Sequence, residues 1–567
     1  MTATPLDPVR LSVVQARLDH LCRHMGWVMT RTARSPIFSQ SHDFSCFATT
    51  RDGVLMSTAD GIPIHTGGGG FAVRAVLDRF GDRLRDGDVY VLNDPYVAGG
   101  NHLPDWVIAR PVMVDGELIG FCCNRAHQSD IGGGAAGTYN PEATEIFHEG
   151  LRLPVVQLVD AGDLRDDVWE LLLLNSRTPD LLDGDLRAML GSTRIGADRL
   201  CDIAVDLGVA EALAAFDGVC EHADRRFRDT VSALPDGTWH AVETWDDDCF
   251  GPVDPPLELH LALTVAGDSL TVDFTGTSPQ IRGFKNSGWV NTWSAISMGL
   301  ASYFDPDLPR NEGTFRCVEM IAPEGTIVNA RPPAPMTMNT VIPAHEIVHL
   351  VWRCLSQAAP DRSLAGWGKN IFGVTAGSHD DAPYVLYHWN AAAGGGATLE
   401  RDGFNQIGHL IALGGLTLPD VEFTEQRYPV RFHRQEFRCD GGGAGERRGG
   451  TGIEYEIDVL TPARWSFRGE GLGEPTGWGA HGGAAGAGGE IVLHDLDGTG
   501  RPFVAPKYGL AELGPVRMVA RSPGGGGWGD PRDRDRSLVE RDVRDGVVSP
   551  DAARDLYGYE PGDESAS

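Results

Sequence analysis

Apolar side chains recur at intervals of three and four positions through the first thirty residues. This spacing is typical of a helix that buries one stripe, and Asp7 followed by Pro8 is a favourable cap and first-turn pair. The apolar positions are Leu11, Val14, Leu18, Leu21, Met25 and Val28. We predict an amphipathic helix from Asp7-Pro8 to about Thr30, with a packing role only.

Runs rich in β-branched and aromatic residues then predict strands. Residues 39–55 indicate two strands joined by an Asp52-Gly53 turn. Two further strand-like runs cover residues 89–92 and 117–123. Each of these two runs is followed by the same pattern, His-x-x-Asp.

The two His-x-x-Asp patterns are His102 to Asp105 and His127 to Asp130. Pro104 and the surrounding glycines argue against helix, so both copies are expected on loops just past strand ends. One copy alone is common by chance, and a histidine at a strand end often makes only a structural hydrogen bond. Two copies in matched settings favour a site where the loops converge.

Two imidazoles with two or more carboxylates suit a divalent Zn, Mn or Fe(II) ion. His42 and Asp43 stand at the entry to the first strand of residues 39–55. By composition alone they are two further possible ligands, or part of a turn.

A glycine run, Gly67 to Gly70, follows His65 and precedes an apolar-periodic segment over residues 72–80. The pattern indicates a loop that enters a helix, whose free N–H groups could receive an anion. A tight turn is the simpler account.

Residues 163–234 have a helical pattern, which Pro179 and the Asp183-Gly184-Asp185 turn are expected to divide. Apolar and polar side chains alternate along residues 257–274 on both sides of Gly267-Asp268. This pattern predicts a β-hairpin with one solvent-exposed face. The hairpin belongs to a new region that begins at about residue 235.

The remaining elements are a helix, a glycine-dense β region and a helical pair. They cover residues 340–357, the chain beyond residue 422, and residues 533–559. The glycines indicate tight turns and close backbone approach.

The fold class that follows is an α+β multidomain protein. We predict an N-terminal mixed α/β metal-binding region with long helices, a middle region with a β-hairpin and a helix, a glycine-rich β region, and a C-terminal helical tail. Their ranges are 1–234, 235–420, 421–532 and 533–567.

Charge and composition exclude some functions. The chain has 48 basic and 79 acidic residues, a formal charge of −31, which disfavours nucleic acid and anionic membranes as partners. No run approaches the ~20 apolar residues of a membrane span, and no secretory signal is evident at the N-terminus. The ten cysteines are scattered without a C-x-x-C, so we expect a cytoplasmic protein with buried thiols.

A rival metal motif lies in the helix predicted over residues 340–357. His345, Glu346 and His349 have the H-E-x-x-H spacing of zinc peptidases. There is no phosphate-binding loop, because Gly368-Lys369 is followed by Asn370. If ATP is used, we expect another chain to bind it.

A series of strings resembles the hydantoinase B/oxoprolinase family, in order from about Thr30 to Tyr559. They are Asp43-Phe44-Ser45-Cys46, Asn93-Asp94-Pro95-Tyr96, Gly99-Gly100, His102-Leu103-Pro104-Asp105, Ala126-His127, Asp130-Ile131-Gly132-Gly133, Asn175, Arg177, Pro179, Gly184-Asp185-Leu186 and residues 523–531. That family includes metal-bearing subunits of ATP-dependent hydantoinases and lactamases, the corresponding half of 5-oxoprolinases, and large subunits of ketone carboxylases.

The resemblance implies a hetero-oligomer that divides the work. A hydantoinase A-type ATPase subunit would phosphorylate the substrate, and this subunit would hydrolyse the activated cyclic amide. The implied metal ligands are Asp43, His102, Asp105 and His127, which chooses Asp43 over His42 and demotes the H-E-x-x-H helix.

The implied mechanism uses the cation to lower the pKa of water that attacks the activated carbon. His127 and Asp130 are the expected catalytic pair, with Asp130 orienting His127 or taking a proton. His65, Gly67 and Gly68 are expected to bind substrate, because their segment is expected to border it. The glycine run replaces a more usual apolar, Ser- and Met-containing stretch, which leaves the identity of the substrate open.

Three alternatives remain open at the level of sequence. The chain is a subunit of an ATP-dependent ketone carboxylase, a scaffold for its ATPase partner with a vestigial site, or an independent zinc peptidase that uses the H-E-x-x-H helix.

Overall fold

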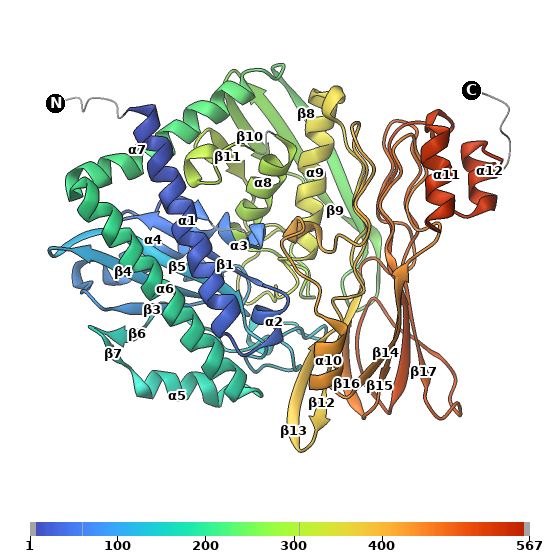
Figure 1. The fold of residues 1–567 in the computed structure, drawn as a ribbon, viewed down its shortest axis with the longest axis horizontal. Helices are drawn as coiled ribbons and strands as arrows, with labels where there is room; N and C mark the ends of the chain where they lie inside the picture. Colours follow the sequence, from blue (N-terminus) through green and yellow to red (C-terminus); the bar gives the residue numbers. More distant parts are fainter. Residues whose placement is uncertain (1–6, 59–60, 305–306, 561–567) are drawn as a thin grey trace. The chain divides into compact units, whose positions relative to one another are not determined.

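The computed structural model describes residues 7–58, 61–304 and 307–560. Internal contacts divide the chain into two compact units, and Figure 1 shows the helices and strands coloured along the sequence. Unit 1 is Met1–Cys354 with Gly415–Thr417, and unit 2 is Leu355–Gly414 with Leu418–Ser567. The finer domain boundaries expected from the sequence stay predictions.

Unit 1 is built on an antiparallel seven-stranded sheet with the order β2-β1-β5-β4-β3-β6-β7. The strands are β1 (Phe44–Thr50), β2 (Leu55–Thr58), β3 (Val89–Leu92), β4 (Asp105–Val114), β5 (Glu117–His127), β6 (Val156–Asp160) and β7 (Asp163–Leu164). The predicted strands are all present. β4 was not predicted, because Arg110 and Pro111 interrupt its apolar run.

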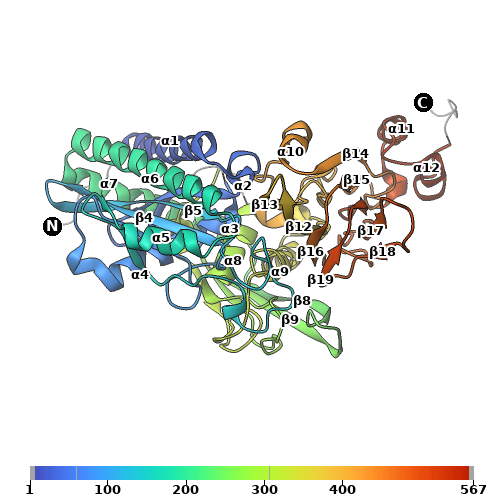
Figure 2. The ribbon, with the colours of Figure 1, turned by 90° about the horizontal axis from the view of Figure 1, so that it is seen from below.

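Helices cover both faces of this sheet, as Figure 2 shows. The helices of unit 1 before residue 235 are α1 (Pro8–Thr32), α2 (Pro36–Ser39), α3 (Pro63–Thr66), α4 (Gly69–Phe80), α5 (Asp166–Leu174), α6 (Pro179–Leu207) and α7 (Val209–Val231). Phe121 and Cys123 of β5 share a core with α4. Asn124 points to the other face and donates to the Met189 carbonyl of α6, at 2.9 Å. Alternation along β5 therefore places Arg125 and His127 on the α4 face.

The first helix confirms its prediction, since Asp7 caps it and it ends at Thr32. The predicted division of the later helical segment at Pro179 is confirmed, since α5 ends at Leu174 and α6 begins at Pro179, but the predicted turn at residues 183–185 is wrong. Pro179 is the first residue of α6, where a missing N–H costs nothing. Gly184 lies inside α6, at a position where a Cβ would overlap the Arg34 side chain. Asp185 faces inward and accepts from the Arg34 N–H at 2.8 Å.

A second sheet of unit 1 has the order β11-β10-β9-β8. Its strands are β8 (Gly237–Asp247), β9 (Pro252–Ala266), β10 (Ser269–Asp273) and β11 (Val318–Ile321). This confirms the predicted hairpin. Two more helices follow, α8 (Trp289–Tyr303) and α9 (Ile342–Ala358), and the last four residues of α9 belong to unit 2.

Unit 2 has two sheets, with the orders β13-β12-β16-β19 and β14-β15-β20-β17-β18. The strands are β12 (Phe372–His379), β13 (Ala382–Tyr387), β14 (Val430–Phe437), β15 (Ile453–Val459), β16 (Ala463–Arg468), β17 (Glu490–Asp495), β18 (Phe503–Val504), β19 (Tyr508–Leu513) and β20 (Val516–Arg521). The helices are α10 (Val421–Arg427), α11 (Arg536–Arg544) and α12 (Pro550–Tyr557). The last two confirm the predicted terminal helical pair.

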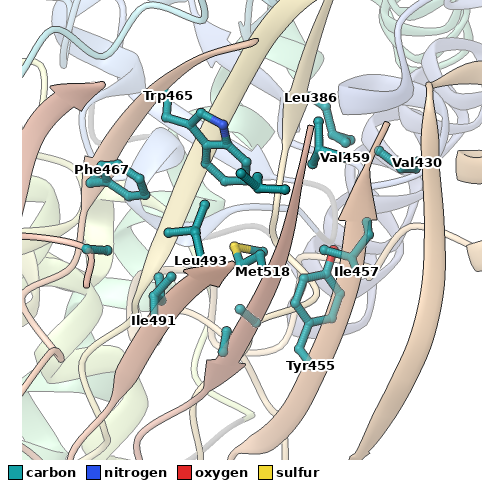
Figure 3. Close-up of a cluster of buried hydrophobic side chains, with 14 of the residues drawn as sticks. Leu386, Val430, Tyr455, Ile457, Val459, Trp465, Phe467, Ile491, Leu493 and Met518 are labelled. Carbon is teal, nitrogen blue, oxygen red and sulfur yellow. The ribbon is translucent and has the colours of Figure 1, made fainter. Parts of the chain in front are cut away.

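The core of unit 2 lies between its two sheets (Figure 3). Trp465 and Phe467 come from one sheet, and Ile457, Leu493 and Met518 come from the other. Side chains of both sheets therefore interdigitate as in a sandwich.

None of the helices in the described part of the chain has the length and apolar character that a membrane span requires.

The glycine-dense segments of unit 2 pack backbone against backbone, as the sequence predicted. Gly525 N donates to Gly450 O, and Gly443 N donates to Gly525 O, both at 2.9 Å. A Cβ on Gly525 would overlap the Gly395 carbonyl. A side chain at this position therefore cannot be accommodated without moving backbone.

We expect Gly525→Ala to destabilise unit 2 severely, because backbone on both sides must shift. Gly514→Ala is the matched control, since a Cβ there meets nothing within 4 Å. Thermal unfolding should show a lower melting temperature or loss of soluble protein for the first variant only. Equal melting temperatures for both variants would contradict the packing argument.

Candidate metal centre

Three residues with acidic or imidazole side chains lie at the same edge of the first sheet, where three neighbouring strands begin or end. β5 lies between β1 and β4 and is antiparallel to both. Asp43 immediately precedes β1, Asp105 begins β4, and His127 ends β5. In the register Asp105 is directly opposite His127, and the His127 N–H donates to the Asp43 carbonyl at 3.1 Å.

His102 joins this edge from the loop between β3 and β4. Its Nε2 lies 2.8 Å from Asp105 Oδ1, and His127 Nδ1 lies 3.1 Å from the same oxygen. One ligand atom each from His102, Asp105 and His127 lies within 4.8 Å of the others, and all three residues are buried. The structure brings together these three of the predicted ligands, and their role in binding a metal stays a prediction. The expectation of loops just past strand ends is wrong for Asp105 and His127, which belong to strands.

His65 and Asp43 lie beside this group. His65 comes from α3, and its Nε2 is 3.2 Å from Asp105 Oδ2 and 3.6 Å from Asp43 Oδ1. Asp43 therefore adjoins the three-residue group through His65. The alternative ligand His42 is 3.2 Å from the Thr417 hydroxyl through its Nδ1.

Burial and mutual charge set the protonation of the group. Burial raises the pKa of Asp105, but His102 and His65 outweigh it and hold that pKa well below its ordinary value. Burial lowers the pKa of His102, but Asp105 outweighs it and the pKa is raised. Burial lowers the pKa of His127 despite its bond to Asp105. A cation that binds here would compete with a proton for His102.

The donor set fits a divalent cation. Asp105 Oδ2 is buried and receives no well-directed hydrogen bond, although His65 is near it. Buried carboxylate oxygens normally have such partners, because leaving one without a partner is costly. A buried carboxylate oxygen without such a hydrogen bond, placed beside two imidazoles, is a suitable ligand for Zn, Mn or Fe(II).

Outer contacts fix the two imidazoles. His102 Nδ1–H donates to the Thr337 carbonyl at 2.6 Å, which leaves Nε2 to face Asp105. The Tyr139 ring stacks on His127 with centroids 5.7 Å apart and planes at 18°, and Thr138 Oγ1 lies 3.5 Å from His127 Nε2. Such contacts orient metal-ligating histidines.

Glu149 supports the Thr337 contact from behind. It is 1% exposed, and its carboxylate accepts from the N–H groups of Thr337 at 2.7 Å and Met336 at 3.1 Å. Burial raises the pKa of Glu149 to about 7, although these two bonds act against the rise. The carboxylate thus holds the backbone segment that orients His102.

Arg125 ties together the two segments that carry His65 and His102. It lies on β5 two residues before His127 and is fully buried. Its Nη1 donates to His65 O at 2.8 Å and to Asn101 Oδ1 at 2.6 Å, and its Nη2 donates to Gly99 O at 3.0 Å. Burial lowers the pKa of Arg125 to about 10.

These outer residues were not found by sequence reasoning. A charge at Arg125 inside an otherwise apolar strand was the available signal. Nothing local marked Glu149 or Thr337.

Asp130 is held by backbone N–H groups and by an arginine. Its carboxylate accepts from the N–H groups of Gly132, Gly137 and Arg177, and pairs with the Arg177 guanidinium at 3.0 Å. These bonds shape the loop that carries Thr138 and Tyr139. Its predicted catalytic role stays a prediction, and its contacts favour positioning.

Gly67 and Gly68 pack against α8. A Cβ on Gly67 would come 2.8 Å from Ser294 Cα, and one on Gly68 would overlap Val290. Close approach of the α3 segment to α8 therefore requires glycine here. Their predicted role in substrate binding remains a prediction.

The H-E-x-x-H helix forms a separate group. Glu346 and His349 of α9 gather with Glu243 of β8, while the His345 and His349 rings lie 4.3 Å apart. Trp245 Nε1–H donates to Glu346 Oε1 at 2.9 Å. The carboxylate that a peptidase would use as its base is therefore held by an indole.

Known proteins are similar to this chain over nearly its whole length. The model of the family described as Hydantoinase B/oxoprolinase matches residues 7–531. Caprolactamase subunit beta of Pseudomonas jessenii is 35% identical over 98% of this chain and 96% of its own length. The crystal structure of ATP-dependent caprolactamase from Pseudomonas jessenii has a TM-score of 0.89 at 32% identity, over 99% of this chain and 98% of that one.

The fold extends to a more distant protein. The nucleotide-free structure of acetone carboxylase has a TM-score of 0.89 at 20% identity, over 98% of this chain and 80% of that one. At this identity the similarity concerns the fold alone.

We expect Arg125→Lys to weaken divalent metal binding roughly tenfold, the lower end for loss of outer-shell support. A lysine keeps the charge but cannot hold three acceptors in a planar fork. Arg110→Lys on neighbouring β4 is the matched control. Competition with a chromophoric chelator measures the affinity, and equal affinities for both variants would contradict the role of Arg125.

We expect Glu149 to make stability depend on pH. Its folded pKa of about 7 lies above the ordinary 4.5, so the folded state binds the extra proton and stability is lost as pH rises through 7. Between pH 5.5 and 8 the loss is about 2 kcal/mol. Urea unfolding of the metal-free protein should show this loss relative to Glu149→Gln. Parallel pH profiles would show that Glu149 does not titrate in this range.

Proposed function

The chain belongs to the hydantoinase B/oxoprolinase family, and we propose that it is the metal-bearing subunit of an ATP-dependent enzyme that hydrolyses a cyclic amide. The observation that carries the proposal is the buried group of His102, Asp105 and His127, with one ligand atom from each within 4.8 Å of the others. A relative of nearly the same length is named a subunit of caprolactamase, which supports an amide over other substrates.

The residues proposed to hold the cation are Asp43, His102, Asp105 and His127. Such a cation supplies Lewis acidity, which polarises an oxygen or lowers the pKa of water. Asp43 adjoins the other three through His65, at 3.6 Å. Two carboxylates and two imidazoles leave the site neutral with a divalent ion, which limits the cost of burying charge.

The two histidines His102 and His65 differ in which ring nitrogen is available for binding. His102 is held by Thr337 with its Nδ1 protonated, so only Nε2 is available to the cation. His65 faces both carboxylates through Nε2, and its buried Nδ1 has no hydrogen-bond partner among the described residues. We propose His65 as the residue that binds a polar group of the substrate.

The ATP-dependent step is proposed to occur in a partner. The sequence has no phosphate-binding loop, and the relative is named a beta subunit. A hydantoinase A-type ATPase subunit would activate the amide oxygen by phosphorylation. This subunit would then act on a carbon made electrophilic in advance, so its own residues need only bind, orient and transfer protons.

The ketone carboxylase alternative has less support. The acetone carboxylase structure shares the fold at 20% identity, which does not extend to a reaction. The lactamase relative is closer in sequence, at 35% identity. The cyclic amide is therefore the substrate class we propose.

The test uses the chain purified with its ATPase partner. We expect the complex to open the ring of a lactam or hydantoin in the presence of ATP. His102→Ala and His127→Ala should each lose one equivalent of bound metal. Each variant should also lose about 100-fold of the activity, the upper end for disruption of a metal site. Product analysis by mass spectrometry measures the first result, and elemental analysis measures the second. His240→Ala, an exposed histidine of β8, is the control.

Three outcomes would contradict the proposal. Ketone consumption that requires bicarbonate would favour the carboxylase. Metal content unchanged in both histidine variants would favour the scaffold. ATP-independent cleavage of peptides that is abolished by Glu346→Gln would favour the peptidase.

A further inference from the structure

We propose that Glu243, Glu346 and His349 form a second divalent-cation site, between β8 and α9 of unit 1. It shares no residue with the centre described above and does not depend on the proposed function. One ligand atom from each of the three residues lies within 4.8 Å of the others. Glu346 and His349 are fully buried, and Glu243 is half-buried.

Strand alternation and helix periodicity bring the three side chains together. Glu243 and Trp245 of β8 share the face that is covered, since the residues between and beside them are exposed. Glu346 and His349 are three apart on α9 and so lie on one face. The indole of Trp245 contacts Glu346 at 2.9 Å, which confirms that the two faces meet.

The spacing that the cluster uses differs from that of a zinc peptidase. A peptidase ligates through the two histidines at i and i+4 and keeps the glutamate as a base. Here the group contains the glutamate and the histidine at i and i+3, the Glu-x-x-His arrangement of carboxylate-bridged metal sites in helical proteins. The site we infer is therefore one of ligation rather than peptide hydrolysis.

The charges around the cluster favour a bound cation. Glu243 and Glu346 bring two carboxylates, and Arg353, one turn beyond His349, pairs with Glu243 at 3.2 Å. The nearby Lys285 pairs with Asp247 at 2.9 Å. Carboxylates buried at this depth require positive charge beside them, and a metal ion would supply it together with Arg353.

The surrounding contacts match those of a metal site. Trp245 donates to Glu346 and Arg353 pairs with Glu243, so each carboxylate has an outer partner that orients it. The His345 ring packs against His349 at 78° and limits its rotation. One imidazole nitrogen and two carboxylate oxygens suit Zn, Mn or Fe(II) better than Mg or Ca.

A cation here would brace the first centre. α9 follows directly from the segment that contains Thr337 and Thr340. Thr337 O lies 2.6 Å from His102 Nδ1, and Thr340 Oγ1 lies 3.5 Å from it. Fixing α9 to β8 therefore restrains the backbone that orients a ligand of the first centre.

The test counts metal in purified full-length protein that has been stripped with a chelator, loaded with zinc and desalted. We expect two equivalents in the wild type, one in His127→Ala, one in His349→Ala, and none when both changes are combined. Glu243→Gln, at the half-buried rim, is the second probe of the site in case His349→Ala does not fold. His240→Ala, on the exposed face of β8, should retain two equivalents.

A second measurement separates ligation from stability. In the His127→Ala background, zinc should raise the apparent Tm, and Glu243→Gln should abolish that rise. Equal metal content in the wild type, His349→Ala and Glu243→Gln would overturn the inference and identify the cluster as a hydrogen-bonded network with a protonated imidazole. One equivalent that only His127→Ala removes would overturn it and leave the proposed function intact. One equivalent that only His349→Ala and Glu243→Gln remove would support it and contradict the first centre.

Discussion

The site in unit 1 depends on one buried carboxylate, that of Asp105. It is inaccessible to solvent, yet its pKa is held well below the ordinary value because His102 and His65 face it. Removing a carboxylate from water is costly unless opposite charge and hydrogen bonds replace the solvent. The imidazoles supply part of that compensation, and a divalent cation would supply the rest. The arrangement thus prepares a binding place for positive charge.

The antiparallel order of the sheet makes this arrangement possible. Because β5 lies between β1 and β4 and opposes both, the start of β1, the start of β4 and the end of β5 lie at one edge. Two further buried ionisable groups then hold the loops around that edge, Arg125 by its fork and Glu149 through the backbone at Thr337. Buried polar networks of this kind restrict the geometry of the segments they join, although each charge in them is costly to bury.

The two histidine- and carboxylate-containing groups of unit 1 illustrate different ways of building a ligand set. The first collects side chains from a loop and the ends of strands, so its geometry follows from sheet register. The second takes two residues from one turn of α9 and one from β8. A helix fixes the relation of Glu346 to His349 locally, but only the packing of β8 against α9 adds Glu243. This packing turns a motif associated with peptidases into a different set of ligands.

The sequence by itself determined the elements whose signals are local. The cap and periodicity of α1, the alternation of the β9–β10 hairpin and the paired His-x-x-Asp patterns were all readable, because each depends on residues close in the chain. The resemblance to a family chose Asp43 over His42. Tertiary structure decided the rest: that Gly184 lies within α6, that β4 exists, and that Arg125, Glu149 and Thr337 support the ligands. These depend on contacts between residues far apart in sequence, such as Gly184 with Arg34 and Glu149 with Thr337. Local propensity carries no information about such contacts, because only the register of strands and the packing of helices bring the residues together.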